Sequence, residues 1–154
     1  MTTARVGIGY DSHRFAAGRR LVLGGVEIEH DQGLEGHSDA DALAHAIIDA
    51  VLGAAGLGDL GTHFPPSDER WRDADSIELL RTAVAMVSGR VLNVDATVIC
   101  EAPRLGEHRA EMERRLTDAA GGPVSVKATS NEGLGWIGRG EGIACVAVAL
   151  LETG

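Results

Sequence analysis

The sequence places a carboxylate and an imidazole two residues apart where they could hold a metal ion. Val6, Ile8 and Tyr10 alternate with other residues, which predicts a strand, and we expect it to end at Asp11. Residues i and i+2 of an extended segment project to the same side, so Asp11 and His13 should converge at the mouth of this strand. Alone, a DxH pair is a weak metal signal, because a capping Asp beside a surface His has the same spacing.

A third donor could come from the first predicted helix. Asp41, His45 and Asp49 are spaced to share one helix face, opposite the apolar stripe. Such a polar face is usually just solvated. The alternative is that His45 joins Asp11 and His13 as a ligand, leaving the fourth tetrahedral position of a zinc ion open. Asp41 or Asp49 would then hold the His45 ring.

Two further clusters lie in the C-terminal third of the chain. The hydroxyls and backbone N–H groups of Lys127–Glu132 suit an anion, and Glu132 suits a hard cation such as Mg²⁺. A helix N-cap with an acidic first turn explains that spacing equally well. In Gly138–Gly142, three glycines force a tight path, and Arg139 and Glu141 could form a simple ion pair.

Periodicity and turn residues predict the elements that position these clusters. Gly24-Gly25 joins two short apolar runs as a hairpin, Ser38 caps the first helix, and Asp75 caps the second. The remaining predicted elements are a strand over Val91–Cys100, a helix over Gly106–Ala120, and strands over Val124–Ala128 and Ile143–Leu151.

This order predicts an α+β fold: a single mixed sheet with three helices packed on one face, plus a small hairpin. The 154 residues suit a single domain spanning 1–154. Two predicted strands carry apolar side chains on both sides: Val91–Cys100 and Ile143–Leu151. Alternate residues of a strand point to opposite faces, so both faces of the sheet should be buried. Three helices cannot cover both faces, which favours oligomerisation through the free one.

Composition excludes several classes of partner. With 23 acidic residues against 14 Lys and Arg, the net charge of −9 disfavours a nucleic-acid or anionic-membrane binder. An anionic substrate would need local positive charge from metal ions, backbone N–H groups or a few arginines. Cys100 and Cys145 form no CxxC motif, and no apolar run suits a signal peptide or a membrane span. We therefore expect a cytoplasmic protein with reduced cysteines.

Read together, seven segments resemble the 2-C-methyl-D-erythritol 2,4-cyclodiphosphate synthase family of the non-mevalonate isoprenoid pathway. They are GYDSH (9–13), LGGVEI (23–28), GHSDADALAHAIIDAVLGAAGLGDLGTHFP (36–65), ADS (74–76), NVDATVICEAP (93–103), VSVKATSNEGLGW (124–136) and GRGEGIACVAVALL (138–151). The resemblance covers essentially the whole chain. It is specific because the motifs occur in order and at matching spacing.

The resemblance implies a homotrimer with active sites between adjacent subunits. By position, Asp11, His13 and His45 match zinc ligands and Glu132 matches a magnesium or manganese ligand, while His37 and Ser130 match residues that stabilise the transition state. The implied substrate-binding residues are Asp11, Ser12, His13, His37, Ser38, Asp59, Leu60, Gly61, Phe64, Pro65, Pro66, Ser67, Asp68, Cys100, Glu101, Ala102, Pro103, Arg104, Leu105, Gly106, Thr129, Asn131, Trp136 and Arg139.

The implied reaction is attack of the 2-phosphate of 4-diphosphocytidyl-2-C-methyl-D-erythritol 2-phosphate on its β-phosphorus, which expels CMP. The nucleophile is already anionic, so two metals and positioning suffice without a general base. The chain departs from the common family pattern at Ser130 for Thr, Pro66 for an acidic residue and Arg104 for Lys. Its length favours a monofunctional enzyme over the fusion with a cytidylyltransferase found in some relatives.

The Gly138–Gly142 turns of the trimer are expected to meet at the threefold axis, where three Arg139 side chains would suit an isoprenoid diphosphate. Two other functions compete with the synthase. A zinc hydrolase would need a general-base Glu near the metal, and no HExxH motif is present. A trimeric protein that only binds a nucleotide or isoprenoid diphosphate would tolerate loss of the metal ligands.

Overall fold

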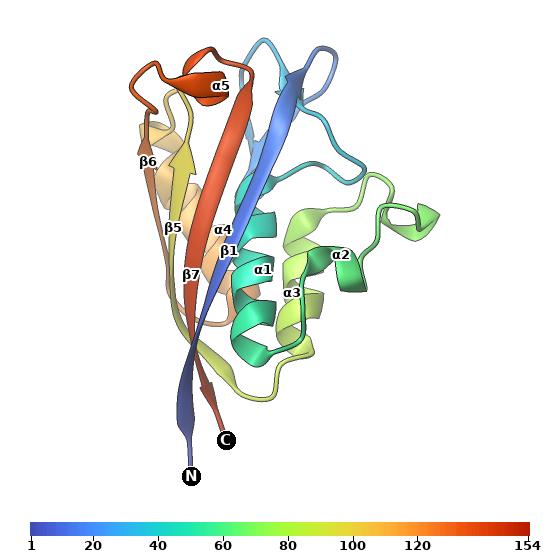
Figure 1. Ribbon diagram of the computed structural model, residues 1–154, viewed down its shortest axis with the longest axis vertical. Helices are drawn as coiled ribbons and strands as arrows, with labels where there is room; N and C mark the ends of the chain where they lie inside the picture. The colour runs from blue at the N-terminus through green and yellow to red at the C-terminus, as the bar shows by residue number, and fades with distance from the viewer.

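A five-stranded mixed sheet carries the helices on one of its faces (Figure 1). This computed structural model describes residues 1–154. The strand order is β4-β1-β7-β5-β6; β5 and β6 are parallel, and the other neighbours are antiparallel. The strands are β1 (Thr3–Ala16), β4 (Gly33–Leu34), β5 (Arg90–Ile99), β6 (Val124–Thr129) and β7 (Gly142–Thr153), with β2 (Leu21–Leu23) and β3 (Val26–Ile28) as a separate hairpin.

Three longer helices cover the inner face of the sheet, as the sequence predicts. α1 (Ala42–Ala55) packs against β1 and β7, α4 (Arg109–Ala120) packs against β6, and α3 (Ser76–Ala85) packs on both helices. The short elements are α2 (Leu60–His63), α5 (Gly135–Gly138) and the 3₁₀ turns Glu69–Trp71 and Gly106–His108. None of the helices is long and apolar enough to cross a membrane.

Three predicted boundaries are wrong. β1 continues past Asp11 to Ala16 because its pairing with β7 extends to Arg14, opposite Gly142. α1 begins at Ala42 with Asp41 as its N-cap, not at Ser38, because Ala40 takes a left-handed φ of 57° that a helix cannot continue. The third helix begins as a 3₁₀ turn at Gly106 and becomes α-helical only at Arg109.

Two glycines set how closely α1 lies on the sheet. Gly7 and Gly9 face the helix, and a Cβ atom at either position would collide with the α1 backbone, at Ala50 and Ala46 respectively. Their side-chain hydrogens allow the contact that a larger residue would prevent. This close approach brings the first turn of α1 against β1, where Asp11 and His13 lie.

The other face of the sheet is uncovered in the single chain. Val6, Ile8 and Tyr10 of β1 point to this open face and are 69%, 71% and 55% exposed, and Val148 of β7, opposite Ile8, is 41% exposed. The β5–β6 half of the face is polar and carries an Asp95–Lys127 ion pair. An apolar strip of this kind is typical of a protein interface.

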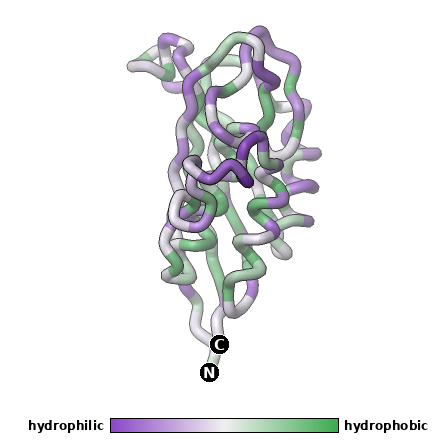
Figure 2. Tube along the Cα trace, turned by 90° about the vertical axis from the view of Figure 1, so that its right-hand side faces the viewer, coloured by the Kyte–Doolittle hydropathy of each residue, from purple (hydrophilic) through white to green (hydrophobic).

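The long axis of the molecule follows the strands. The two termini lie side by side at one end, where Thr3 pairs with Thr153 (Figure 1). At the other end, hydrophilic loops gather, while hydrophobic segments run along the strands and the helix sides below them (Figure 2). The polar end is therefore where solvent-accessible chemistry can be built.

Candidate active site

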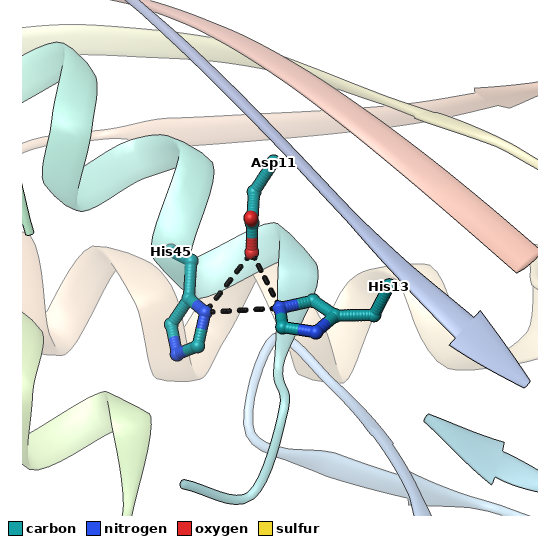
Figure 3. A group of neighbouring side chains, drawn as sticks. All are labelled: Asp11, His13 and His45. Carbon is teal, nitrogen blue, oxygen red and sulfur yellow. Dashed lines mark hydrogen bonds and ion pairs between the residues drawn. The ribbon is translucent and has the colours of Figure 1, made fainter. Parts of the chain in front are cut away.

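Asp11, His13 and His45 bring one oxygen and two nitrogen atoms together (Figure 3). Asp11 Oδ2 lies 2.8 Å from His13 Nε2 and 3.0 Å from His45 Nδ1, and the two nitrogen atoms are 3.4 Å apart. Ligands roughly 2.0 Å from a tetrahedral zinc ion stand roughly 3.3 Å from one another. The three atoms are thus already spaced to hold such an ion, and the donor set of one carboxylate and two imidazoles suits zinc.

Two elements position these side chains. Asp11 and His13 project from the helix-facing side of β1, as the i, i+2 rule predicts, and His45 lies in the first turn of α1. His13 Nδ1 contacts the backbone oxygen of Glu35 at 2.7 Å, and that carbonyl can only accept. His13 Nδ1 therefore carries a proton, and Nε2 either donates a second proton to Asp11 or, once that proton leaves, offers a lone pair to a metal ion.

Burial and charge oppose each other within the cluster. Burial disfavours the Asp11 carboxylate, but hydrogen bonds from His13 and His45 outweigh it and lower the pKa of Asp11 to about 2. Burial also disfavours the charged imidazole of His13, yet the hydrogen bond to Asp11 raises the pKa of His13 above its usual value. The negative carboxylate therefore attracts a cation, whether a proton on His13 or a metal ion.

The face of α1 that carries Asp41, His45 and Asp49 is not solvated. Asp41 is completely buried and accepts N–H bonds from Gly24, Gly25 and Ala44, so it joins the hairpin to the helix. Asp49 accepts from the backbone N–H of Leu60. The prediction that either carboxylate holds the His45 ring is therefore wrong.

Ser76 holds that ring instead, and its role was missed by sequence reasoning. Its hydroxyl oxygen lies 2.8 Å from His45 Nε2 and also contacts the carboxylate of Asp39. Ser76 lies 31 residues from His45, so no spacing rule links them. The one signal in the sequence is its place in the short matching stretch Ala74–Ser76.

His37 and Ser38 lie beside the cluster. Ser38 Oγ is 3.2 Å from His45 Nε2, and His37 Nε2 is 3.1 Å from the backbone oxygen of Asp68. His37 thus contacts the Phe64–Asp68 loop. Asp59 caps α2 by accepting from Thr62 and is exposed.

A second group of predicted site residues lies where β5 and β6 end. The backbone N–H of Cys100 donates to Thr129 O at 3.0 Å, and the Glu101 carboxylate accepts from Gly133 N at 2.6 Å. Asn131 N–H also donates to the Glu101 carboxylate at 3.4 Å, so these bonds join Cys100–Gly106 to Thr129–Gly133. Glu132 is exposed in a turn with φ of 54°, and α5 begins later with Leu134 as its N-cap, so the helix-cap alternative for Glu132 is wrong.

Several other residues near this group are exposed. Lys127 pairs with Asp95 at 2.6 Å, and Arg139 pairs with Glu141 at 2.6 Å, which confirms the simple ion pair considered for Gly138–Gly142. Trp136 lies on α5 and is 36% exposed. Ser130 Oγ accepts from the backbone N–H of Glu132 at 3.2 Å.

Within one chain, the Asp11–His13–His45 cluster and the residues at the ends of β5 and β6 do not lie together. β7 and β5 lie between β1 and β6, and three strand spacings amount to about 14 Å. The metal-binding cluster and Glu132 therefore lie toward opposite edges of one sheet. Fold and cluster together define an α+β protein with a group of side chains that could hold a metal ion.

Comparison with known proteins gives the family. Residues 4–152 match the model of the YgbB family. The 2-C-methyl-D-erythritol 2,4-cyclodiphosphate synthase of Rubrobacter xylanophilus is 60% identical over 96% of this chain and 94% of its own length. The chain belongs to the YgbB family, whose curated relatives are 2-C-methyl-D-erythritol 2,4-cyclodiphosphate synthases, and it is an enzyme.

Solved structures agree with the fold. The bifunctional IspDF of Campylobacter jejuni matches all of this chain with a TM-score of 0.94 at 37% identity, and the match covers 43% of that longer chain. The CDP complex of IspF from Plasmodium falciparum matches 96% of this chain and 95% of its own length with a TM-score of 0.83 at 33% identity.

Proposed function

We propose that this chain converts 4-diphosphocytidyl-2-C-methyl-D-erythritol 2-phosphate into 2-C-methyl-D-erythritol 2,4-cyclodiphosphate and CMP. A bond forms between an oxygen of the 2-phosphate and the β-phosphorus, and the bond from the β-phosphorus to the oxygen of CMP breaks. One observation carries the proposal: the Asp11–His13–His45 cluster is preformed in a chain that matches this family along nearly its whole length.

The proposed roles follow from where the side chains lie. Asp11, His13 and His45 would hold zinc and Glu132 would hold Mg²⁺ or Mn²⁺, and such ions supply positive charge to phosphate oxygens. His37 and Ser130 would donate hydrogen bonds to charge that develops on the transferred phosphoryl group. Because the attacking oxygen is already anionic, the residues chiefly orient the two phosphates, which is the larger part of such catalysis.

The nucleotide is assigned to the second group of residues. The substrate-binding residues of Cys100–Gly106 and Thr129–Asn131 would hold the cytidine diphosphate, with Trp136 and Arg139 nearby. Support comes from the bonds that Cys100 and Glu101 make to the second segment and from the CDP bound in the Plasmodium falciparum relative. Asp59–Gly61 and Phe64–Asp68 would close over the methylerythritol part, beside the metal cluster.

We further propose a homotrimer in which one chain supplies the metal cluster and its neighbour supplies Glu132 and the nucleotide pocket. The separation of the two groups across the sheet and the apolar strip on the open face support this arrangement. A heterologous interface of this kind repeats around a threefold axis. Gly138–Gly142 would then meet at the axis, with Arg139 available to an isoprenoid diphosphate.

The reaction is tested by supplying the substrate with Mg²⁺ and following the products by ³¹P NMR. The cyclic diphosphate and CMP are expected together. His45→Ala should lose both zinc and activity while it stays folded. A zinc hydrolase would also release CMP but would leave an open bisphosphate, and that product would overturn the cyclisation.

The shared site is tested by complementation between two inactive variants. Co-expressed His13→Ala and Glu132→Gln chains form hybrids in which about one half times one half, roughly a quarter, of the interfaces pair two intact halves. Each pure variant is the control. Recovery of roughly a quarter of parental activity is expected, and verified hybrids without activity would mean that one chain holds both metals.

The remaining assignments stay predictions of the sequence. They are a single synthase domain over residues 1–154 and a cytoplasmic location. The location is proposed because both cysteines, Cys100 and Cys145, are free and buried, as is usual for reduced thiols in the cytosol.

A further inference from the structure

We infer that Asp39 and Ser76 form a directional hydrogen-bond chain that fixes the tautomer of His45 and so makes its Nδ1 atom the metal donor. The inference rests on the proposed function, because it takes the Asp11–His13–His45 cluster as the metal site. Asp39 and Ser76 act here as positioning residues, since neither contacts the cluster atoms themselves.

The contacts of Ser76 leave it little freedom. Its backbone N–H donates to Asp39 Oδ2 at 2.9 Å, and its hydroxyl contacts the other carboxylate oxygen, Oδ1. The same hydroxyl oxygen lies 2.8 Å from His45 Nε2. Because Ser76 is fully buried, no solvent can replace any of these partners.

The direction of the chain follows from hydrogen-bond chemistry. A carboxylate can only accept, so the hydroxyl proton of Ser76 goes to Asp39. The Ser76 oxygen then offers only lone pairs to His45, and Nε2 must carry the proton. Ser38 Oγ, 3.2 Å from the same nitrogen, adds a more distant partner.

The consequence falls on the opposite ring nitrogen. A neutral imidazole carries one N–H, so protonation at Nε2 leaves a lone pair on Nδ1. That atom is the one that faces Asp11 Oδ2 at 3.0 Å and His13 Nε2 at 3.4 Å. Asp11 is also only an acceptor, so in the metal-free protein a second proton on Nδ1 can bridge to it; because Ser76 holds the proton on Nε2, the Nδ1 proton is the one that leaves when a metal binds. His45 therefore presents Nδ1 to a metal, whereas His13 presents Nε2.

The backbone around Asp39 is shaped to hold this chain. Asp39 N–H donates to Ala74 O, and Asp41 N–H donates to Asp39 Oδ1, both at 3.1 Å. Between the two aspartates, Ala40 is completely buried with a left-handed φ of 57°. This turn lets Asp39 reach the start of α3 while Asp41 reaches the hairpin.

Asp73 provides a matched control. Asp39 and Asp73 line the same open cavity of about 270 Å³, so either change to Asn removes one negative charge from one place. Asp73 makes no side-chain hydrogen bond to the chain, and its left-handed φ of 55° suits Asn as well as Asp. Only Asp39→Asn should therefore affect His45.

The first measurement is the zinc dissociation constant, obtained by competition with a chromogenic chelator. Ser76→Ala and Asp39→Asn should each bind zinc 10–100-fold more weakly than the parent, as expected when a partner of a ligating His is lost. Asp39→Asn keeps the size of the side chain but places an NH₂ group against a donor of Ser76. Asp73→Asn should bind zinc like the parent.

The second measurement is the ¹⁵N NMR signature of His45 in the metal-free proteins, whose folding is checked by thermal melting. In the parent Nε2 should stay protonated, whether or not Nδ1 carries a second proton toward Asp11, and both chain variants should lose that preference. Parental zinc affinity and tautomer in Asp39→Asn, or an equal loss in Asp73→Asn, would overturn the inference. A parent that binds no zinc would contradict the proposed metal site, while the metal-free tautomer would still decide this inference.

Discussion

At the scale of single residues, the site depends on protons being held at defined atoms. Glu35 O accepts from one nitrogen of His13, and Ser76 occupies one nitrogen of His45, so each ring has one nitrogen left for Asp11 or a cation. Asp11 stays ionised because its hydrogen bonds outweigh its burial. A cation held by this cluster would give a chain of net charge −9 the local positive charge that an anionic substrate needs.

Glu132→Gln tests the second proposed metal at this scale. The variant should keep zinc, because Glu132 lies toward the other edge of the sheet, but it should stay inactive as Mg²⁺ is raised, since an amide oxygen binds a hard cation less well than a carboxylate. A magnesium titration of activity, with zinc measured by elemental analysis, checks both statements. Glu78→Gln, exposed on α3, is the control. A titration that matches the parent would remove Glu132 from the metal assignment.

At the scale of elements, the contact between α1 and β1 sets the distance from His45 to Asp11. The helix backbone rests on Gly7 and Gly9, so β1 carries no side chain at the place where the two elements cross. At the helix start, Asp41 joins α1 to the hairpin turn. The three ligands are therefore positioned by packing between elements and not by a flexible loop.

Gly9→Ala should push α1 away from β1. The added Cβ would collide with the backbone of Ala46, so we expect a loss of about 1–3 kcal/mol in the free energy of unfolding. Zinc affinity should fall as well, because His45 moves with the helix. Gly53→Ala is the matched control: its Cβ would lie 3.8 Å from the nearest atom, Ile8 O, and should stabilise α1 by about 0.5–1 kcal/mol. Denaturant unfolding that ranked the two variants equally would contradict this account.

Asp41 should make stability depend on pH. Burial raises its pKa from 3.8 to about 6 in the folded protein. Because the folded state holds this proton more tightly than the unfolded chain, the free energy of unfolding should fall as pH rises from about 4 to about 6, by on the order of 1–3 kcal/mol. Asp41→Asn should lack this contribution. Parallel slopes for parent and variant in denaturant titrations would show that the hydrogen bonds to Asp41, not its burial, dominate.

At the scale of the whole molecule, the open face of the sheet divides into an apolar half on β1 and β7 and a polar half on β5 and β6. Val6, Ile8 and Tyr10 are more than half exposed in the single chain. Burial of such a strip stabilises an assembly by about 25 cal/mol per Å² of apolar surface. The proposed trimer would bury the strip and bring the two groups of site residues together.

Ile8→Asp should break the assembly, because it places a charge in the middle of the apolar strip. Sedimentation velocity should show trimers for the parent and monomers for the variant, with zinc still bound, since Ile8 faces away from α1. Ala110→Asp, exposed in the first turn of α4, should leave the parental size unchanged. A monomeric and active parent would contradict the shared site.

The sequence by itself determined most of the elements and brought together two of the three residues of the candidate metal cluster. The Gly24-Gly25 hairpin, the cap at Asp75 and the convergence of Asp11 with His13 follow from local rules, because turn chemistry and strand alternation depend only on near neighbours. Only the tertiary structure decided that Ser76, and not Asp41 or Asp49, holds His45, and that α1 begins after Ala40. Those contacts join segments that lie tens of residues apart, and their geometry depends on how closely α1 packs on two glycines of β1, which no local periodicity encodes.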